Sequence, residues 1–204
     1  MTPNEQNLTI TLEEHFQTQD TLYRTTVISD TLPHLELSEV EIKECIFKQV
    51  TFISCRLEKA YFYHCTFESC DFSNIDLSHA TFRQCIFRDC KFSNAILEKT
   101  FQENIQYLDC YLKDTLWEGS HCKQVTLKNC NASNAIFAEM TLKNTTLIET
   151  NFTGVDFSNT SLQHIDFTTC QIEGITVYQK DLRGVIMTQW QALSFMKILG
   201  IIVK

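Results

Sequence analysis

The chain has 204 residues, a net charge of −8 and ten cysteines, and 44% of its residues are hydrophobic. This length and composition suffice for one or two domains with a core, and an acidic chain without basic runs is a poor ligand for nucleic acid. No run of about 18 apolar residues is present, which argues against a membrane-spanning helix. The first residues show neither a basic start nor an apolar stretch, so we expect no secretory signal and reduced cysteines in the cytoplasm.

The N-terminal segment, residues 1–36, lacks the repeat that dominates the rest of the chain. Within it, residues 8–12 (L-T-I-T-L) alternate apolar and polar side chains in the manner of a short strand. We expect this segment to cap the first coil of the repeat region.

Residues 37–187 repeat with a period of five. Of the 31 positions at every fifth residue from Leu37 to Met187, which we call centres, 22 are Phe or Leu, and they include twelve of the fifteen phenylalanines. A second column, two residues before each centre, is small or β-branched and holds nine of the ten cysteines. This period fits neither a helix nor a strand, and it requires a turn in every unit. Four units then close a coil of 20 residues, so that the chain makes about eight coils stacked like parallel strands.

The repeat is weakest over residues 97–122, where Gln102 and Cys122 replace large apolar residues at centres. On the same side of the predicted coil, Tyr61, Tyr63 and Phe101 fall at outward positions. Exposed aromatic side chains are favoured at protein interfaces. Two interpretations are open for this side: a locally bulged coil and an aromatic contact patch.

Residues 188–204 depart from the repeat and predict a helix followed by a short β-segment. Thr188 and Gln191 have the spacing of a capping box, and a helix over about 189–199 would end at Gly200. An apolar helix at the end of a rod either caps the core or packs against a second copy. We therefore expect a dimer interface made by Trp190, Leu193, Met196, Leu199, Ile201, Ile202 and Val203.

The cysteines fall 20 residues apart in two predicted ladders, Cys45, Cys65, Cys85 and Cys70, Cys90, Cys110, Cys130. Stacked cysteines come within the range of a disulfide, but their side chains would run parallel, and no CxxC pair or histidine cluster accompanies them. Buried structural thiols are favoured over redox or metal chemistry. The histidines are scattered and no catalytic motif is present. We therefore expect no enzymatic activity, no cofactor and no metal site.

Segments such as C-D-F-S-N (70–74) and V-D-F-S-N (155–159) match the consensus A(D/N)LXX, and the chain resembles the pentapeptide-repeat proteins over about three quarters of its length. The resemblance implies an all-β solenoid, the right-handed quadrilateral β-helix. The C-terminal D-L-R-G-V (181–185), followed by Q-A (191–192), Met196 and L-G-I (199–201), resembles the end of Qnr-type quinolone-resistance proteins. This second resemblance implies a homodimer, joined through the C-terminal helix, that mimics duplex DNA. It also implies that the dimer binds DNA gyrase and topoisomerase IV, and that it protects or inhibits them.

If residues 20 apart stack, every unit lies on one of four faces. The face centred on residues 37, 57, 77 and onward to 177 carries a net charge of −5. Mimicry of DNA needs such a face, whose expected partner-binding carboxylates are Glu36, Glu39, Asp76, Glu118, Glu139 and Asp156. The alternative is a solvated surface that only maintains solubility. A second function is also open: a general scaffold that binds another protein through its flat faces or exposed aromatic residues.

Overall fold

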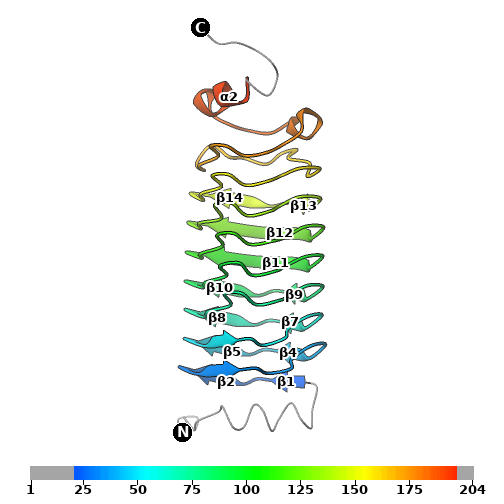
Figure 1. The fold of residues 1–204 in the computed structure, drawn as a ribbon, viewed down its shortest axis with the longest axis vertical. Helices are drawn as coiled ribbons and strands as arrows, with labels where there is room; N and C mark the ends of the chain where they lie inside the picture. The colour runs from blue at the N-terminus through cyan, green and yellow to red at the C-terminus, as the bar shows by residue number, and fades with distance from the viewer. Residues whose placement is uncertain (1–20, 197–204) are drawn as a thin grey trace.

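The computed structural model describes residues 21–196, which form a rod of stacked coils with β1 (Thr21–Tyr23) at one end and α2 (Gln189–Phe195) at the other (Figure 1). Each short strand pairs in parallel with the strand 20 residues further along the chain; Thr21 pairs with Glu41, and Glu41 pairs with Tyr61. This offset confirms four five-residue units per coil. The protein is therefore the parallel β-solenoid that the period predicts.

Strands occupy two of the four faces along most of the rod. The first face holds β1 (Thr21–Tyr23), β4 (Glu41–Lys43), β7 (Tyr61–Tyr63), β9 (Thr81–Arg83), β13 (Thr141–Lys143) and the first halves of β11 (Phe101–Leu108) and β12 (His121–Lys128). The second face holds β2 (Thr26–Ile28), β5 (Ile46–Lys48), β8 (Thr66–Glu68), β10 (Ile86–Arg88), β14 (Thr146–Ile148) and the second halves of β11 and β12. On the third face β3 (Thr31–Pro33) pairs with β6 (Thr51–Ile53). The rest of the third face, and the fourth face, are joined by isolated bridges.

The first coil begins earlier than the sequence interpretation placed it. Strands β1, β2 and β3 pair with the next coil, and Leu22, Val27 and Leu32 are buried at centres. The assignment of residues 21–36 to a segment without the repeat was therefore wrong. The polar residues Thr25 and Asp30 occupy the second column there, and they obscure the pattern. Residues 1–20, which include the expected strand at 8–12, lie outside the described residues.

The strand ladder is also shorter than the expected eight coils. It spans six steps of 20 residues, from Thr21 to Thr141. Beyond it, the chain continues through isolated bridges as far as Ile186. About six turns are thus built on paired strands, and the last part of the rod is held together differently.

The core is one continuous column of side chains. Phe47, Phe67, Phe87 and Tyr107 stack face to face, with neighbouring ring centroids 5.0, 4.8 and 5.0 Å apart, which is close to the spacing of the coils. All twelve phenylalanines at centres are buried, as predicted, and so are the ten free cysteines. Apolar burial and ring stacking therefore stabilise the solenoid, without disulfides in the described chain.

Each unit turns through a residue with left-handed backbone, two positions after the centre. The φ angle there lies between 48° and 71° at every fifth residue from Arg24 to His164. A residue with a side chain adopts this conformation at a cost of about 1–2 kcal/mol, which is smaller for Asn and Asp. In many units an Asp or Asn before the centre supports the turn: Asp71 Oδ1 accepts the backbone N–H of Ser73 at 2.9 Å. The Asp or Asn of the repeat is therefore a turn residue.

The C-terminal end of the rod carries a 3₁₀ turn, η1 (Gln179–Leu182), and a helix, α2 (Gln189–Phe195). The predicted capping box is confirmed, because the N–H of Gln191 donates to Thr188 Oγ1 at 3.2 Å and the N–H of Thr188 donates to Gln191 Oε1 at 2.8 Å. The Gln191 amide nitrogen also donates to the carbonyls of Phe167 and Cys170, both at 2.8 Å, which ties α2 to the last coil. No helix among residues 21–196 is long and apolar enough to cross a membrane.

Candidate functional site

The carboxylates expected to form an acidic surface all belong to the fourth face, but they lie in three different environments. The first two are paired with cations one coil further along: Glu39 Oε1 lies 2.7 Å from Lys59 Nζ, and Glu36 Oε2 lies 3.9 Å from Arg56 Nη1. The hydrogen bond and charge of Lys59 lower the pKa of Glu39. At this end of the rod the face therefore offers a partner less negative charge than its carboxylates alone suggest.

Asp76 and Asp156 hold turns as well as carrying charge. Each accepts a backbone N–H at 2.8 Å, from Ser78 and Ser158 respectively. Only Oδ1 is used in each case, and both side chains are half-buried. Replacing either aspartate would disturb the backbone together with the surface charge.

Glu118 and Glu139 are the exposed carboxylates of the fourth face that have no ion pair with residues 21–196. Glu98 precedes Glu118 by one coil, and it is likewise unpaired in the described chain. Carboxylates on adjacent coils lie about 5 Å apart along the rod and repel each other. Lys99, in the same unit as Glu98, offsets part of this charge, and a cation supplied by a partner would relieve the remaining repulsion at Glu118 and Glu139.

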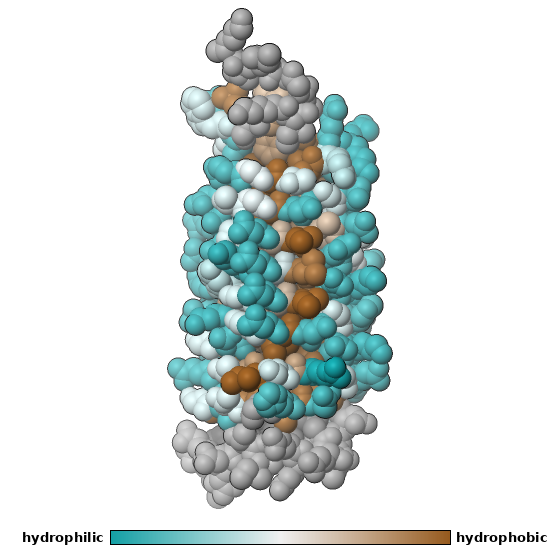
Figure 2. Space-filling view, in the orientation of Figure 1, coloured by the Kyte–Doolittle hydropathy of each residue, from teal (hydrophilic) through white to brown (hydrophobic). Residues whose placement is uncertain are grey.

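Sequence reasoning missed an apolar line on the same face. Ile96, Leu116 and Ile136 fill one bridged column between Asp76 and Asp156, and Ile136 is 40% exposed. Figure 2 shows a narrow apolar band along the rod between hydrophilic flanks. We call these three residues the aliphatic line. The residue before each centre, compared at intervals of 20, was the signal that could have found them. The fourth face therefore combines apolar and acidic residues, as protein interfaces do.

The three outward aromatic residues lie on the first face, as the register predicts, but Phe101 is separated from the two tyrosines of β7. Thr81 stands between Tyr61 and Phe101 in their shared column. Tyr61 and Tyr63 are half-buried, and the guanidinium of Arg83 lies over the Phe101 ring, 5.3 Å from its centroid. These residues do not form one continuous aromatic surface.

The stretch 97–122 is regular rather than bulged, and β11 and β12 each run unbroken over eight residues. Gln102 is fully buried: its Nε2 donates to Thr100 Oγ1 at 2.9 Å, and its Oε1 accepts the Tyr107 hydroxyl at 3.1 Å. Thr100 Oγ1 also lies 2.9 Å from Ser120 Oγ, whose hydroxyl donates to the Leu97 carbonyl. The interpretation as a bulged coil was wrong because a polar centre can find all its partners inside the core.

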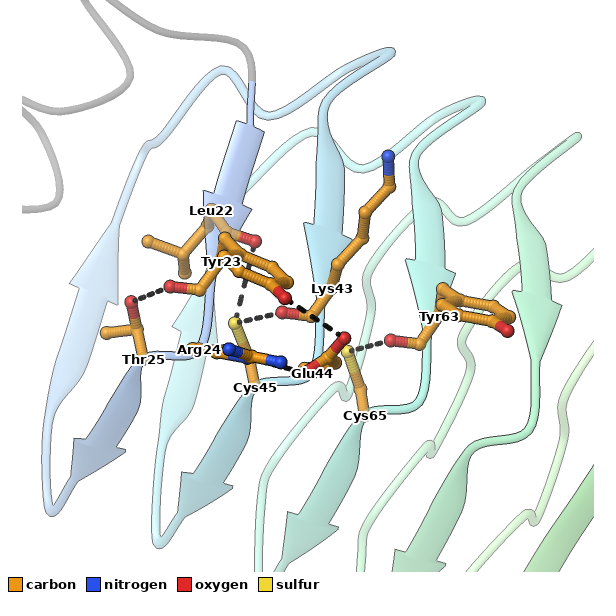
Figure 3. Close-up of polar contacts among 9 residues, drawn as sticks. All are labelled: Leu22, Tyr23, Arg24, Thr25, Lys43, Glu44, Cys45, Tyr63 and Cys65. Atoms are coloured by element: carbon orange, nitrogen blue, oxygen red, sulfur yellow. Dashed lines mark hydrogen bonds and ion pairs between the residues drawn. The ribbon is translucent and has the colours of Figure 1, made fainter.

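The cysteines behave as packing residues. The thiol of Cys45 lies 3.2 and 3.6 Å from the carbonyl oxygens of Lys43 and Leu22, and Cys65 one coil further makes similar contacts (Figure 3). Burial raises the pKa of Cys45 to about 11 and that of Cys122 to about 12. These two thiols stay protonated at neutral pH, whereas attack and metal binding require the thiolate. Cys65 and Cys70 differ, because hydrogen bonds with Cys85 and Cys90 lower their pKa values, although both side chains are buried. Among residues 21–196, no three His, Cys, Asp or Glu side chains are placed to hold a metal ion.

The helix α2 presents apolar side chains away from the core. Trp190 is 74% exposed and Leu193 is 41% exposed, while Phe195 is buried and Met196 is half-buried at the C-cap. Trp190, Leu193 and Met196 are the first residues of the expected dimer interface. The remaining members of the interface lie outside the described residues; they are Leu199, Ile201, Ile202 and Val203. The expected end of the helix at Gly200 lies outside the described residues as well.

Comparison with known proteins finds the same repeat. The family model for the pentapeptide repeat region matches residues 60–137 and 123–193. HetL, a pentapeptide repeat protein involved in heterocyst differentiation regulation from the cyanobacterium Nostoc sp. strain PCC 7120, is similar in fold, with a TM-score of 0.53 and 14% identity over 91% of this chain and 98% of its own. Full-length QnrB1, a plasmid-mediated fluoroquinolone resistance protein, aligns with a TM-score of 0.40 and 16% identity over 89% and 100% of the two chains. No curated protein matches the sequence.

Proposed function

The chain belongs to the pentapeptide-repeat family, and from that premise we propose that it is a DNA-mimicking scaffold without chemistry of its own. In this proposal the fourth face binds the basic DNA-binding surface of DNA gyrase or topoisomerase IV, protects or modulates the enzyme, and confers quinolone resistance. The observation that carries the proposal is the set of unpaired carboxylates in the middle of that face, Glu98, Glu118 and Glu139. The protein would act in the cytoplasm, where these enzymes meet DNA.

Charge alone would make this face a weak substitute for DNA. Duplex DNA carries one phosphate charge per roughly 1.7 Å of axis, whereas the fourth face carries a net charge of −5 along the whole rod. The aliphatic line would add apolar contact that does not depend on salt. We therefore expect binding to weaken with added salt and to persist in part at high salt.

The exposed Trp190 and Leu193 support the second part of the proposal, a homodimer joined at the C-terminal ends. A two-fold dimer of this kind would present the fourth face twice along one longer rod. Light scattering at micromolar concentration measures this directly. A monomer at that concentration would refute the dimer and, with it, mimicry of a long duplex.

Gyrase supercoiling in the presence of ciprofloxacin, with and without the purified protein, tests the function. The informative variant is Glu118→Lys/Glu139→Lys, because neither carboxylate accepts a backbone N–H of a turn, as those of Asp76 and Asp156 do. Glu139 itself has left-handed backbone (φ 57°), and the control variant shares this feature at Glu149 (φ 48°). The matched control, Glu149→Lys/Glu173→Lys, makes the same change in charge at exposed carboxylates outside the fourth face. We expect the first variant to bind gyrase at least about tenfold more weakly, or about 1.4 kcal/mol, and the control to bind like the wild type. Unchanged protection by the first variant would refute the acidic-face mechanism.

A general protein-binding scaffold is the second candidate, and the aliphatic line favours it. If the wild-type protein binds neither gyrase nor topoisomerase IV, this candidate replaces the first. Substitution of Leu116 and Ile136 by serine should then weaken binding to the true partner more than charge reversal does.

A further inference from the structure

The coils separate on two of their four faces near the C-terminal end of the rod. From β1 to β13 each strand of the first face pairs with its successor, but no backbone hydrogen bond joins residues 141–148 to residues 161–168. The same two coils stay bridged on the other faces, Asn151 to Gln171 and Asp156 to Thr176. The rod is therefore open along one side at this level. We call this opening, between residues 141–148 and 161–168, the seam.

Local contacts mark the seam as a real break in the pattern. One coil earlier, the N–H of Asn129 donates to the Ile148 carbonyl at 3.0 Å, but the equivalent N–H of Glu149 donates to the side chain of Thr169 at 3.1 Å. Met140 stands in the second column just before the seam, where the neighbouring coils carry Ser120 and Thr160. The larger Met140 side chain interrupts the column of small residues at the level where the coils separate, and it lines the opening.

A groove of about 520 Å³ lies at the seam, and its rim includes Lys143, Asn144, Gln163 and His164. Its floor reaches the core, because the inward residues Leu142 and Thr145 are only partly buried here. Both also line an apolar void of about 20 Å³ beneath the groove. The hydroxyl oxygen of Thr145 is buried without a hydrogen-bond partner in the described chain.

The charge of the groove differs from that of the whole protein. No carboxylate is among the described residues that line it, although the chain carries a net charge of −8. Lys143 lies at its rim and makes no ion pair with residues 21–196. The groove therefore suits a neutral or acidic occupant, unlike the basic partner proposed for the fourth face.

We propose that the seam binds an extended peptide segment of a partner protein by strand addition. The peptide backbone takes the hydrogen bonds that residues 141–148 and 161–168 do not make with each other, since unpaired strand edges are templates for a further strand. Alternate side chains of the peptide face opposite ways. An aliphatic one enters the opening above Leu142 and Thr145, and an acidic one lies against Lys143.

Hydrogen exchange of the free protein tests the opening itself. Amides that would bond across a closed seam should exchange at least about tenfold faster than those of β12, which is paired on both sides. Amides bonded to the outer coils, such as those of Thr141, Leu162 and Phe167, should stay protected. Equal protection in the two regions would overturn the proposal, because the seam would then be closed in solution.

Binding is tested with a fluorescein-labelled, end-blocked peptide of seven residues that alternates threonine and leucine and carries one aspartate. We expect fluorescence anisotropy to show a Kd below about 1 mM, and at least tenfold weaker binding after N-methylation of alternate amides, which removes the backbone donors. Lys143→Glu should weaken binding of the unmethylated peptide at least tenfold. Lys43→Glu, at the same position five coils earlier, should not.

Circular dichroism verifies that Lys143→Glu and Lys43→Glu keep the solenoid fold. If Lys143→Glu does not fold, the proposal is tested by comparing the unmethylated and the N-methylated peptide on the wild-type protein. Equal binding of both peptides would show an apolar site without strand addition. That result, or the absence of binding at 1 mM, overturns the proposal.

Discussion

Replacing Gln102 by leucine tests the buried polar residues of the core most sharply. The change removes the acceptor of the Tyr107 hydroxyl, at 3.1 Å, and one partner of Thr100, at 2.9 Å. Thr100 keeps its contact with Ser120, but Tyr107 is fully buried, and its hydroxyl is left with neither a protein partner nor water. An unsatisfied buried hydroxyl costs about 1–3 kcal/mol. Because leucine is close to glutamine in volume, we expect Gln102→Leu to lower the unfolding free energy by about that amount.

The double variant Gln102→Leu/Tyr107→Phe distinguishes this explanation from a simple packing defect. It removes the orphaned hydroxyl together with its partner, and replacing both members of a buried pair by apolar groups is nearly neutral. We therefore expect the double variant to be more stable than the single one, and within about 1 kcal/mol of the wild type. Urea unfolding followed by circular dichroism and by fluorescence measures both. A single variant as stable as the wild type, or a double variant less stable than the single, would refute the reasoning.

Three further predictions concern turns, thiols and ion pairs. Asn94 has a φ of 56°, so Asn94→Val should destabilise the protein by about 1–2 kcal/mol in urea unfolding, whereas Asn94→Gly should change it by less than about 1 kcal/mol; equal effects would contradict the turn argument. A thiol reagent at pH 8 should label the native protein slowly and all ten cysteines after unfolding, because the thiols are buried; rapid labelling of most thiols in the native state would contradict this. Lys59 and Lys123 lower the pKa values of Glu39 and Glu103 in the folded protein. The two ion pairs therefore stabilise the fold above the ordinary carboxyl pKa, near 4.3, and this stabilisation is lost as the pH falls through the lower pKa of the folded state. The melting temperature should fall on acidification in this range, and less steeply in Lys59→Met/Lys123→Met; identical pH profiles would exclude the pairs as the cause.

Much of the fold could be predicted because the turn in every unit decides which side chains point inward. Once five residues form one side of a coil, the centres must fill the core, whatever the rest of the unit contains. Phe47 and Phe87 are therefore buried for the same reason, and the cysteines of the second column follow them. The same regularity assigned Glu118 and Glu139 to the fourth face before any contact was known.

The exceptions depend on contacts that a period does not encode. In the sequence, Gln102 looks like an interruption of the apolar centres. Its burial is explained only by the hydrogen bonds that its side-chain amide makes with Thr100 and Tyr107. The ion pair of Glu39 with Lys59 links residues 20 apart, so comparison of charges at that interval could have revealed it. Met140 is an oversized residue in the second column, but its sequence position does not say which faces separate.

The two tryptophans are intrinsic fluorescence probes of two different regions of the protein. Trp117 is 1% exposed in the interior of the solenoid, with its ring centroid 5.5 Å from that of Tyr107, whereas Trp190 is 74% exposed on α2. Emission from the interior indole should lie at shorter wavelength and resist acrylamide quenching, while emission from the terminal indole should be red-shifted and readily quenched. Docking at the C-terminal end should therefore change one spectral component, and melting of the coils the other, without any label attached to the chain.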